Sequence, residues 1–259
     1  MHRRCRLAAL ALAVALAPGP RDAEGAEVAA LYRASWAGLP AGDIRLALSD
    51  DGALYRAEIA IRTVGLPRLV TRFRGSAVSD GHLAGAPLPR HYEALYDLRK
   101  SRDKRLSMNF ASRTPGAAVI AERGPGDTSS KPPLAERYRT DVLDPLSAVT
   151  AIRLELRHGN RGTFAIPVYD GARRFNVLAR VLPKRDGDPA LHLELTLAPI
   201  AGFKGETSSD GDPDDAPRPV AVTFSDDRRL MPLSMSVSLY YLPLVVQLTR
   251  WCRNVPCRW

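Results

Sequence analysis

Few residues of this chain have the types and spacing that chemistry requires. Asp210, Asp212 and Asp214 have the D-x-D-x-D spacing that opens a calcium-binding loop. An EF-hand loop also needs Gly at its sixth position and Glu at its twelfth, where this chain has Asp215 and Ala221. We interpret the run as a solvated acidic loop and predict no metal and no other cofactor.

The histidines and serines give no catalytic pattern either. Ser147 follows Asp144 by three residues, but no G-x-S-x-G nucleophile elbow surrounds it, and the pair fits a helix cap better than a catalytic pair. No histidine beyond the N-terminal segment has a second one at a metal-ligand spacing; these are His82, His91, His158 and His192. We therefore predict a protein that is not an enzyme and has no catalytic residues.

The N-terminal 25 residues have the features of a cleavable secretory signal. A basic start precedes an apolar run at residues 7–17, which is too short to span a bilayer, and a small-residue cleavage site ends at Gly25. We expect residues 1–25 to be removed and residues 26–259 to form a single β-rich domain in the periplasm. No later segment has the roughly 20 apolar residues of a spanning helix, so we expect no transmembrane segment in the mature chain.

Two cysteines remain after this cleavage, Cys252 and Cys257, in the segment RWCRNVPCRW. Their spacing differs from the C-x-x-C of redox enzymes and common zinc sites. In an oxidising compartment, such a pair favours a structural disulfide over free thiols.

The charge of the chain is positive and dispersed. Its net charge is +9, and removal of residues 1–25 takes away four arginines and two acids, which leaves +7. The basic residues are spread over nearly every expected strand, so we expect no nucleic-acid partner. The excess suits a protein that works beside anionic lipids or lipopolysaccharide, although simple solubility explains it equally well. The basic segment 97–105 is either a hairpin tip exposed to water or a contact for lipid headgroups.

Alternation of apolar and polar residues dominates the sequence and predicts about a dozen strands, each with one apolar face. We expect them near 28–36, 42–49, 53–62, 69–78, 90–98, 104–110, 117–122, 163–169, 174–181, 191–197, 219–224, 231–240 and 243–250. Turn residues rich in Asp, Gly and Ser separate many of them, at 49–53, 79–82, 169–172, 185–188 and 225–228. Short turns favour an antiparallel meander, and the Pro-, Gly- and Ser-rich segments 122–137 and 204–219 are expected to be mobile loops.

The segment DPLSAVTAIRLELRHG, residues 144–159, has helical features instead. Asp144 is a good N-cap, Pro145 suits the first helical position, and Gly159 suits the position after the helix. Ala148, Val149, Ile152 and Leu156 recur at helical spacing and give the segment one apolar face. We predict an amphipathic helix that covers the apolar face of a curved sheet.

Four ordered segments of the chain resemble a known family. They are LYRASWAGLPAGDIRLALSDDGALYRAEIAIRTVGL, DVLDPLSAVTAIR, GTFAIPVYDGARRFNVLARV and SDDRRLMPLSMSVSL, spread between Leu31 and Leu239. Together they resemble the domain of unknown function 3108, a family of exported bacterial proteins. The resemblance implies a strongly curved antiparallel sheet or partly closed barrel, similar to lipoprotein carriers or lipocalins. It implies no catalytic residues.

These observations lead to one functional hypothesis with two alternatives. We expect a periplasmic protein that holds a lipid-like or other hydrophobic ligand in its concave apolar face and serves the cell envelope. The expected lining is Trp36, Tyr55, Ile59, Phe73, Phe175, Val177, Met235 and Val237, a set that would equally describe an ordinary core. The apolar segment 240–251 is expected to be a buried strand rather than an exposed patch. The alternatives are an envelope assembly factor that binds protein or glycan through its loops and, less favoured, a hydrolase of envelope polymers.

Overall fold

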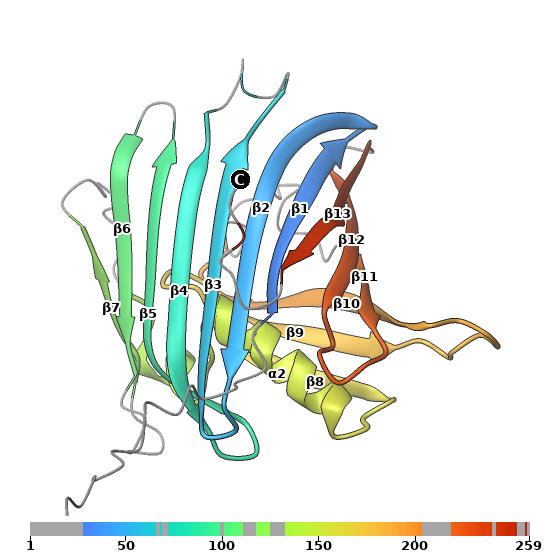
Figure 1. The fold of residues 1–259 in the computed structure, drawn as a ribbon. Helices are drawn as coiled ribbons and strands as arrows, with labels where there is room; N and C mark the ends of the chain where they lie inside the picture. The colour runs from blue at the N-terminus through green and yellow to red at the C-terminus, as the bar shows by residue number, and fades with distance from the viewer. Residues whose placement is uncertain are drawn as a thin grey trace, which may run out of the picture.

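The chain forms one large antiparallel sheet with a helix packed against it (Figure 1). The structure, a computed structural model, describes residues 28–65, 68, 72–98, 101–110, 118–124, 133–203, 219–239, 242–252 and 257. The strands are β1 (Val28–Trp36), β2 (Leu39–Asp50), β3 (Leu54–Thr63), β4 (Arg74–Leu83), β5 (Pro87–Leu98), β6 (Ser101–Asn109), β7 (Ile120–Arg123), β8 (Thr163–Tyr169), β9 (Arg174–Val181), β10 (Ala190–Ala201), β11 (Pro219–Ser225), β12 (Pro232–Leu239) and β13 (Leu242–Cys252). A short 3-10 helix, η1 (Glu136–Tyr138), precedes the α-helix α2 (Pro145–Arg157).

The strand order is that of two meanders joined through the first and last strands. It runs β7-β6-β5-β4-β3-β2-β1-β13-β12-β11-β10-β9-β8, with every neighbouring pair antiparallel. Within each meander, strands that follow one another in the chain pair with each other, as expected for an antiparallel meander. The pairing of β1 with β13 joins the two meanders into a single curved sheet, which confirms the predicted fold class.

The sheet curls without closing by strand pairing, because β7 and β8 are its two edges. Among the described residues, a side chain of β7 reaches across this gap: a guanidinium Nη2 of Arg123 donates to the carbonyl O of Gly171 at 3.1 Å. A Cβ on Gly171 would lie 2.7 Å from Leu106 on β6, so the two edges approach here as closely as a glycine allows. The barrel is thus partly closed by packing rather than by a continuous ladder.

The predicted helix is confirmed at residue level. Asp144 is its N-cap, Pro145 its first residue, and His158 its C-cap, followed by Gly159 with φ 83°. The helix lies against β3, β4 and β5 of one meander and against β8 of the other. The helix therefore covers the apolar face of both meanders and links them to each other. No helix among the described residues is long and apolar enough to cross a membrane.

Two hydrophobic clusters fill the space between the helix and the sheet. The first gathers the N-terminal half of the sheet, β13 and the start of the helix, and includes Leu48, Met108 and Leu146. The second lies between the rest of the helix and β8 to β11, and includes Ile152, Leu156 and Leu193. Met235 on β12 packs against both clusters and links them.

Two expectations from the sequence were wrong. Residues 79–82, predicted as a turn, lie within β4, and the chain turns instead near Gly85. Within the segment 240–251, the described residues 242–251 do form a strand, but only Val246 of β13 is buried, so the strand is largely partly exposed or exposed. The predicted signal peptide, the acidic run at 210–214 and most of the two predicted loops lie outside the described residues.

Candidate ligand-binding face

The face of the sheet that packs on α2, here called the inner face, carries a buried polar cluster at the start of the helix. The cluster consists of Asp144, Ser147, Ser79 and Tyr55, whose exposed fractions are at most 3%. One carboxylate oxygen of Asp144 accepts hydrogen bonds from the backbone N–H groups of Leu146 and Ser147, at 2.9 and 3.0 Å. These bonds satisfy two of the helix's first N–H groups, which have no partner within the helix.

The other carboxylate oxygen of Asp144 anchors the helix to the sheet. It accepts from the hydroxyl of Ser79, on β4, at 2.9 Å and from the hydroxyl of Ser147. The Ser147 hydroxyl also lies 2.6 Å from the hydroxyl of Tyr55, on β3. A polar group that is fully paired can be buried without the usual cost of desolvation, and here the pairing fixes the helix against two strands.

Burial dominates the electrostatics of this cluster. It raises the pKa of the Asp144 carboxyl, and the hydrogen bonds from Ser147, Ser79 and Leu146 oppose this effect. Burial also raises the pKa of the Tyr55 phenol, which stays protonated. All four side chains are shielded from solvent, so a substrate in solution has no access to the serines. The cluster is therefore an anchor for the helix, as the predicted cap indicated.

A second polar anchor holds the middle and end of the helix. Arg153 is 2% exposed, and its guanidinium donates to the carbonyl of Arg229 at 2.7 Å and more weakly to that of Leu230. Its Nη1 lies 3.7 Å from the Oδ2 of Asp50. The guanidinium of Arg157 donates one hydrogen bond to each carboxylate oxygen of Asp50, both at 3.2 Å. Burial lowers the pKa of Arg153 to about 10, so the side chain remains charged near neutral pH.

Burial of the inner face decreases with distance from the helix. On β2 the face runs through Leu48, Leu46 and Ile44, of which the first two are buried and the last is partly exposed. On β3 it likewise runs from Ala57, at 0% exposed, to the partly exposed Ile61. These positions share one face because side chains alternate along a strand and the register has no shift between β2 and β3.

The partly exposed positions form a continuous area, here called the open region. Across β2, β3, β5 and β6 it contains Ile44, Ile61, Tyr96 and Lys104. Tyr96 and Lys104 are register partners, and Gly75 of β4 lies between Ile61 and Tyr96. The ring of Phe73 covers this glycine, since a Cβ at Gly75 would lie 2.8 Å from it. The result is an apolar surface with a single amine among its described side chains.

The predicted lining residues divide between the core and partly exposed positions. Tyr55 and Phe175 are buried in the structure, Tyr55 in the polar cluster and Phe175 in the second hydrophobic cluster. The half-buried members are Ile59, Phe73, Val177, Met235 and Val237, and Trp36 is 37% exposed at the end of β1. The structure therefore does not bring the eight residues together as one lining.

A groove of about 750 Å³ lies on the opposite, outer face of β3 to β6. The side chains that point to this face are Ala60, Arg62, Arg74, Ser76, Leu95, Asp97 and Arg105. Two of the arginines already have carboxylate partners: Arg62 pairs with Asp43 at 3.0 Å, and Arg105 pairs with Glu93 at 2.5 Å. The groove is thus polar, and neighbouring carboxylates neutralise part of its positive charge. It suits an apolar ligand less well than the open region does.

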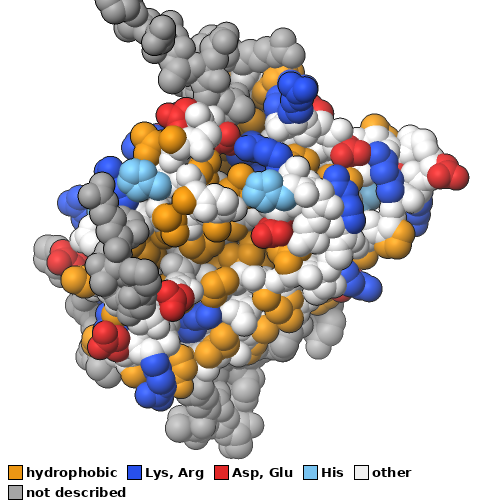
Figure 2. Space-filling view, turned by 90° about the horizontal axis from the view of Figure 1, so that it is seen from below, with side chains coloured by type: hydrophobic (Ala, Val, Ile, Leu, Met, Phe, Trp, Pro, Cys, Tyr) orange, Lys and Arg blue, Asp and Glu red, His pale blue; other side chains and the backbone are white. Residues whose placement is uncertain are grey.

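From below, the side on which α2 lies in Figure 1, hydrophobic side chains gather in a shallow hollow near the centre of the view (Figure 2). Acidic and basic side chains surround this hollow. Leu54 and Leu88 belong to this end of the sheet and are 46% and 41% exposed. No group of three or more possible metal ligands occurs among the described residues.

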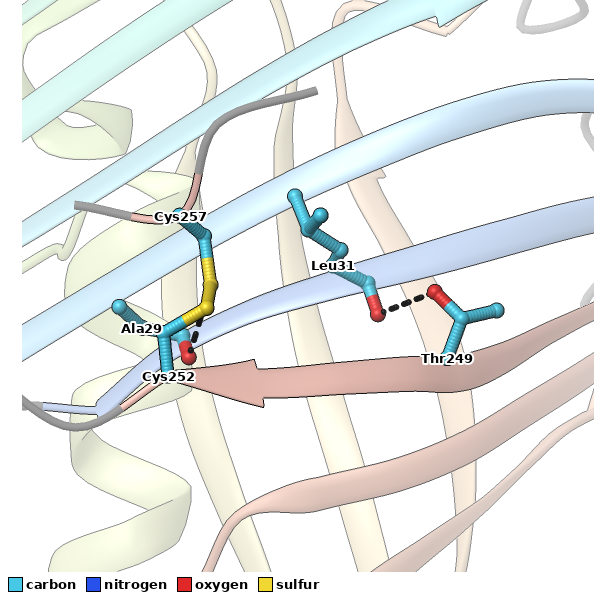
Figure 3. Close-up of a disulfide and its surroundings, with 5 residues drawn as sticks. All are labelled: Ala29, Leu31, Thr249, Cys252 and Cys257. Atoms are coloured by element: carbon cyan, nitrogen blue, oxygen red, sulfur yellow. Dashed lines mark hydrogen bonds between the residues drawn. A yellow bond between two sulfur atoms is a disulfide. The ribbon is translucent and has the colours of Figure 1, made fainter. Parts of the chain in front are cut away.

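The predicted disulfide joins Cys252 to Cys257 (Figure 3). Cys252 ends β13 and is the register partner of Ala29 on β1, and the Sγ of Cys257 lies 3.4 Å from the Ala29 carbonyl O. Nearby, the hydroxyl of Thr249 donates to the carbonyl of Leu31 at 3.0 Å. Cys257 is 2% exposed, so the disulfide secures the chain against the strand pair that joins the two meanders.

The sequence did not reveal the partners of Asp144. Ser79 and Tyr55 lie far from it in the chain, and Ser79 occurs in a Ser-Asp-Gly segment that is typical of turns. The only available signal was the alternation of β3 and β4, which places Tyr55 and Ser79 on an apolar face. A small polar residue on such a face indicates a buried hydrogen-bond partner.

Comparison with solved structures supports the fold. The beta-barrel-like protein of domain of unknown function DUF1849 from Brucella abortus is similar, with a TM-score of 0.56 and 9% identity, over 87% of this chain and 96% of that chain. The hypothetical protein CT021 from Chlamydia trachomatis matches with a TM-score of 0.36 and 6% identity, over 90% of this chain and 91% of its own. At these identities the first similarity concerns the fold alone, and the second is too weak to support an argument.

Comparison with curated proteins gives no match. A family model does match: the one described as "Protein of unknown function (DUF3108)" covers residues 31–186, which is more than half of the chain. The protein therefore belongs to the DUF3108 family.

Proposed function

We propose that the protein is a non-enzymatic component of the periplasm that binds a lipid-like ligand on its open region and thereby serves the cell envelope. The observation that supports this proposal is the decrease of burial along the inner face. Next to the helix the side chains of β2 and β3 are buried, and at the other end of the same strands Ile44 and Ile61 remain partly exposed. Burial of such apolar surface by a ligand is favourable, at roughly 25 cal/mol per Å².

Lys104 narrows the chemical class of the ligand. It is the register partner of Tyr96 and therefore points to the inner face, beside the apolar side chains of the open region. An ammonium group at the border of an apolar surface favours a ligand with an acyl chain and an anionic headgroup. A fatty acid or an acidic phospholipid has this chemistry.

The first test is direct extraction. The mature protein is purified from the periplasm, extracted with organic solvent, and the extract is analysed by mass spectrometry. We expect about one amphiphile per protein molecule, in line with a single open region. An extract without lipid, from a protein that also fails to take up a fluorescent fatty acid, would refute the proposal and favour binding of protein or glycan through the loops.

A pair of neighbouring substitutions tests the role of the inner face. Lys104→Gln removes the inward ammonium and should weaken binding of an anionic fluorescent fatty acid about fivefold. Arg105→Gln removes one positive charge from the outer face of the same strand and should leave the affinity unchanged. Equal weakening by both substitutions would indicate general attraction to positive charge and would exclude a specific role for Lys104.

A further inference from the structure

The end of the sheet opposite the helix, here called the hairpin rim, carries a second feature that the proposed ligand does not explain. Strands β1, β3 and β5 end here and their neighbours β2, β4 and β6 begin here, at the top of Figure 1. The β12–β13 hairpin joins them, because Trp36 is the register partner of Leu244 and the N–H of Ala37 donates to the carbonyl of Pro243 at 3.0 Å.

Two adjacent hairpins of the rim are apolar and exposed. In the β1–β2 hairpin Trp36 is 37% and Leu39 is 52% exposed, and in the β12–β13 hairpin Leu242 is 42% exposed. Their sequences contain no charge over residues 34–42 and 230–249, although charged residues make up 25% of the chain. Large apolar side chains that are exposed together and without charge mark a surface that contacts another molecule.

The neighbouring connections of the rim are basic. The β3–β4 connection, residues 64–73, and the first two residues of β4 contain three arginines and no acid; the arginines are Arg68, Arg72 and Arg74, and all three are exposed. The β5–β6 hairpin, residues 97–105, has five basic residues and two acidic ones. The rim thus combines an apolar tip with a basic flank.

The opposite end of the sheet differs in charge. There the β2–β3 turn, residues 51–53, contains Asp51 and no basic residue, and Figure 2 shows acidic side chains among the basic ones around the hydrophobic hollow. Exposed leucines alone therefore do not distinguish the rim. Their combination with an excess of basic over acidic residues does.

We infer that the hairpin rim docks on the surface of an anionic phospholipid bilayer. Trp36 suits the headgroup level, where tryptophan is enriched, while Leu39 and Leu242 enter the border of the acyl chains. The arginines of the β3–β4 connection and of β4 face the anionic headgroups, each of which attracts a basic side chain. Docking at this end brings the open region next to the bilayer, since Ile61 and Tyr96 lie near the rim ends of β3 and β5.

Vesicle binding tests this inference with a matched control. The mature chain is centrifuged with vesicles of equal parts phosphatidylglycerol and phosphatidylcholine, and with vesicles of phosphatidylcholine alone. We expect binding to the anionic vesicles that weakens with salt. Leu39→Ser with Leu242→Ser should lower the partition coefficient about tenfold. Leu54→Ser with Leu88→Ser, two leucines of similar exposure at the helix end, should leave it unchanged.

Two further measurements separate the contributions. Arg68→Gln and Arg72→Gln should each lower binding to the anionic vesicles about fivefold. Brominated acyl chains should quench tryptophan fluorescence in the wild type and not in Trp36→Phe. A wild-type chain that does not bind anionic vesicles would overturn the inference. Equal losses of vesicle binding in the rim leucine pair and in the helix-end leucine pair would overturn it as well. A dimer in sedimentation velocity that the Leu39 and Leu242 substitutions dissociate, without vesicle binding, would show that a second copy occupies the rim.

The docking and the ligand can fail separately. A protein that releases lipid on extraction but does not bind vesicles would refute docking and keep the proposed function. A protein that binds vesicles through Leu39 and Leu242 but yields no lipid would refute the proposed ligand binding and keep the docking.

Discussion

Removal of the Asp144 carboxylate should destabilise the fold far more than an ordinary surface substitution. In Asp144→Ala the N–H groups of Leu146 and Ser147 lose their acceptor, which costs about 1 kcal/mol for an N-cap. The hydroxyls of Ser79 and Ser147 lose an acceptor in a buried site, which adds about 2 kcal/mol. We therefore expect the free energy of unfolding to fall by about 3 kcal/mol.

Urea denaturation followed by circular dichroism measures this change. Asp51→Ala is the matched control, because Asp51 also accepts from two backbone N–H groups, those of Ala53 and Leu54, but in an exposed turn. Water can replace its carboxylate, so a much smaller effect is expected. A loss below about 1 kcal/mol in Asp144→Ala would refute the reasoning. It would mean that the cost of burying the carboxyl offsets the bonds that it makes.

The raised pKa of Asp144 gives the same site a defined pH dependence. A carboxyl whose pKa is higher in the folded than in the unfolded chain stabilises the fold fully below the ordinary value of about 4. This contribution is lost as the pH rises through the folded-state pKa. Asp144→Asn has no proton to lose, so the stability of the wild type relative to this variant should decline from about pH 4 upward. A relative stability that instead grows with pH would show that the hydrogen bonds outweigh burial.

Two further substitutions test the remaining anchors. Arg153→Ala should lower the free energy of unfolding by about 3 kcal/mol, because the carbonyls of Arg229 and Leu230 lose a buried donor and Asp50 loses one of its two basic neighbours. Arg157→Ala should have a smaller effect, because its guanidinium is more exposed. Equal losses from the two substitutions in urea denaturation would contradict this prediction. Cys252→Ser should cost about 2 kcal/mol through loss of the disulfide, and addition of reductant should lower the Tm of the wild type but not of the variant.

The helix could be predicted from the sequence because its determinants are local. Asp144 and Pro145 begin it, and Gly159 follows it in the left-handed conformation that glycine favours. The strands β8 and β9 agree with the predicted ranges 163–169 and 174–181 for the same reason: alternation is strong, and the turn between them contains Asp170 and Gly171. Tertiary contacts add little to what these short segments specify.

The error at residues 79–82 has the opposite cause. Ser-Asp-Gly is typical of turns, but Ser79 is paired with Ala57 and Tyr92 in the ladder and hydrogen-bonded to Asp144. A contact over 65 residues of sequence outweighs a local preference, and nothing in the segment itself indicates it. The turn lies instead at Gly85, whose φ of 78° is in the left-handed region that glycine favours. Gly81 is also a glycine, so the sequence did not distinguish between the two positions.

The division of the inner face was likewise beyond the sequence, although it determines the proposed function. Alternation assigns Ala57, Ile59 and Ile61 to one face equally, yet their burial falls from complete to partial along β3. Only the position of the helix, fixed by bonds of Asp144 to β4 and of Arg153 to the segment before β12, explains this gradient. Because the anchors hold the helix at one end, the apolar positions at the other end remain available, and they lie on the side of the hairpin rim. Ligand binding and membrane docking would therefore share one end of the molecule for a structural reason: the same helix that completes the core leaves the rest of the sheet open.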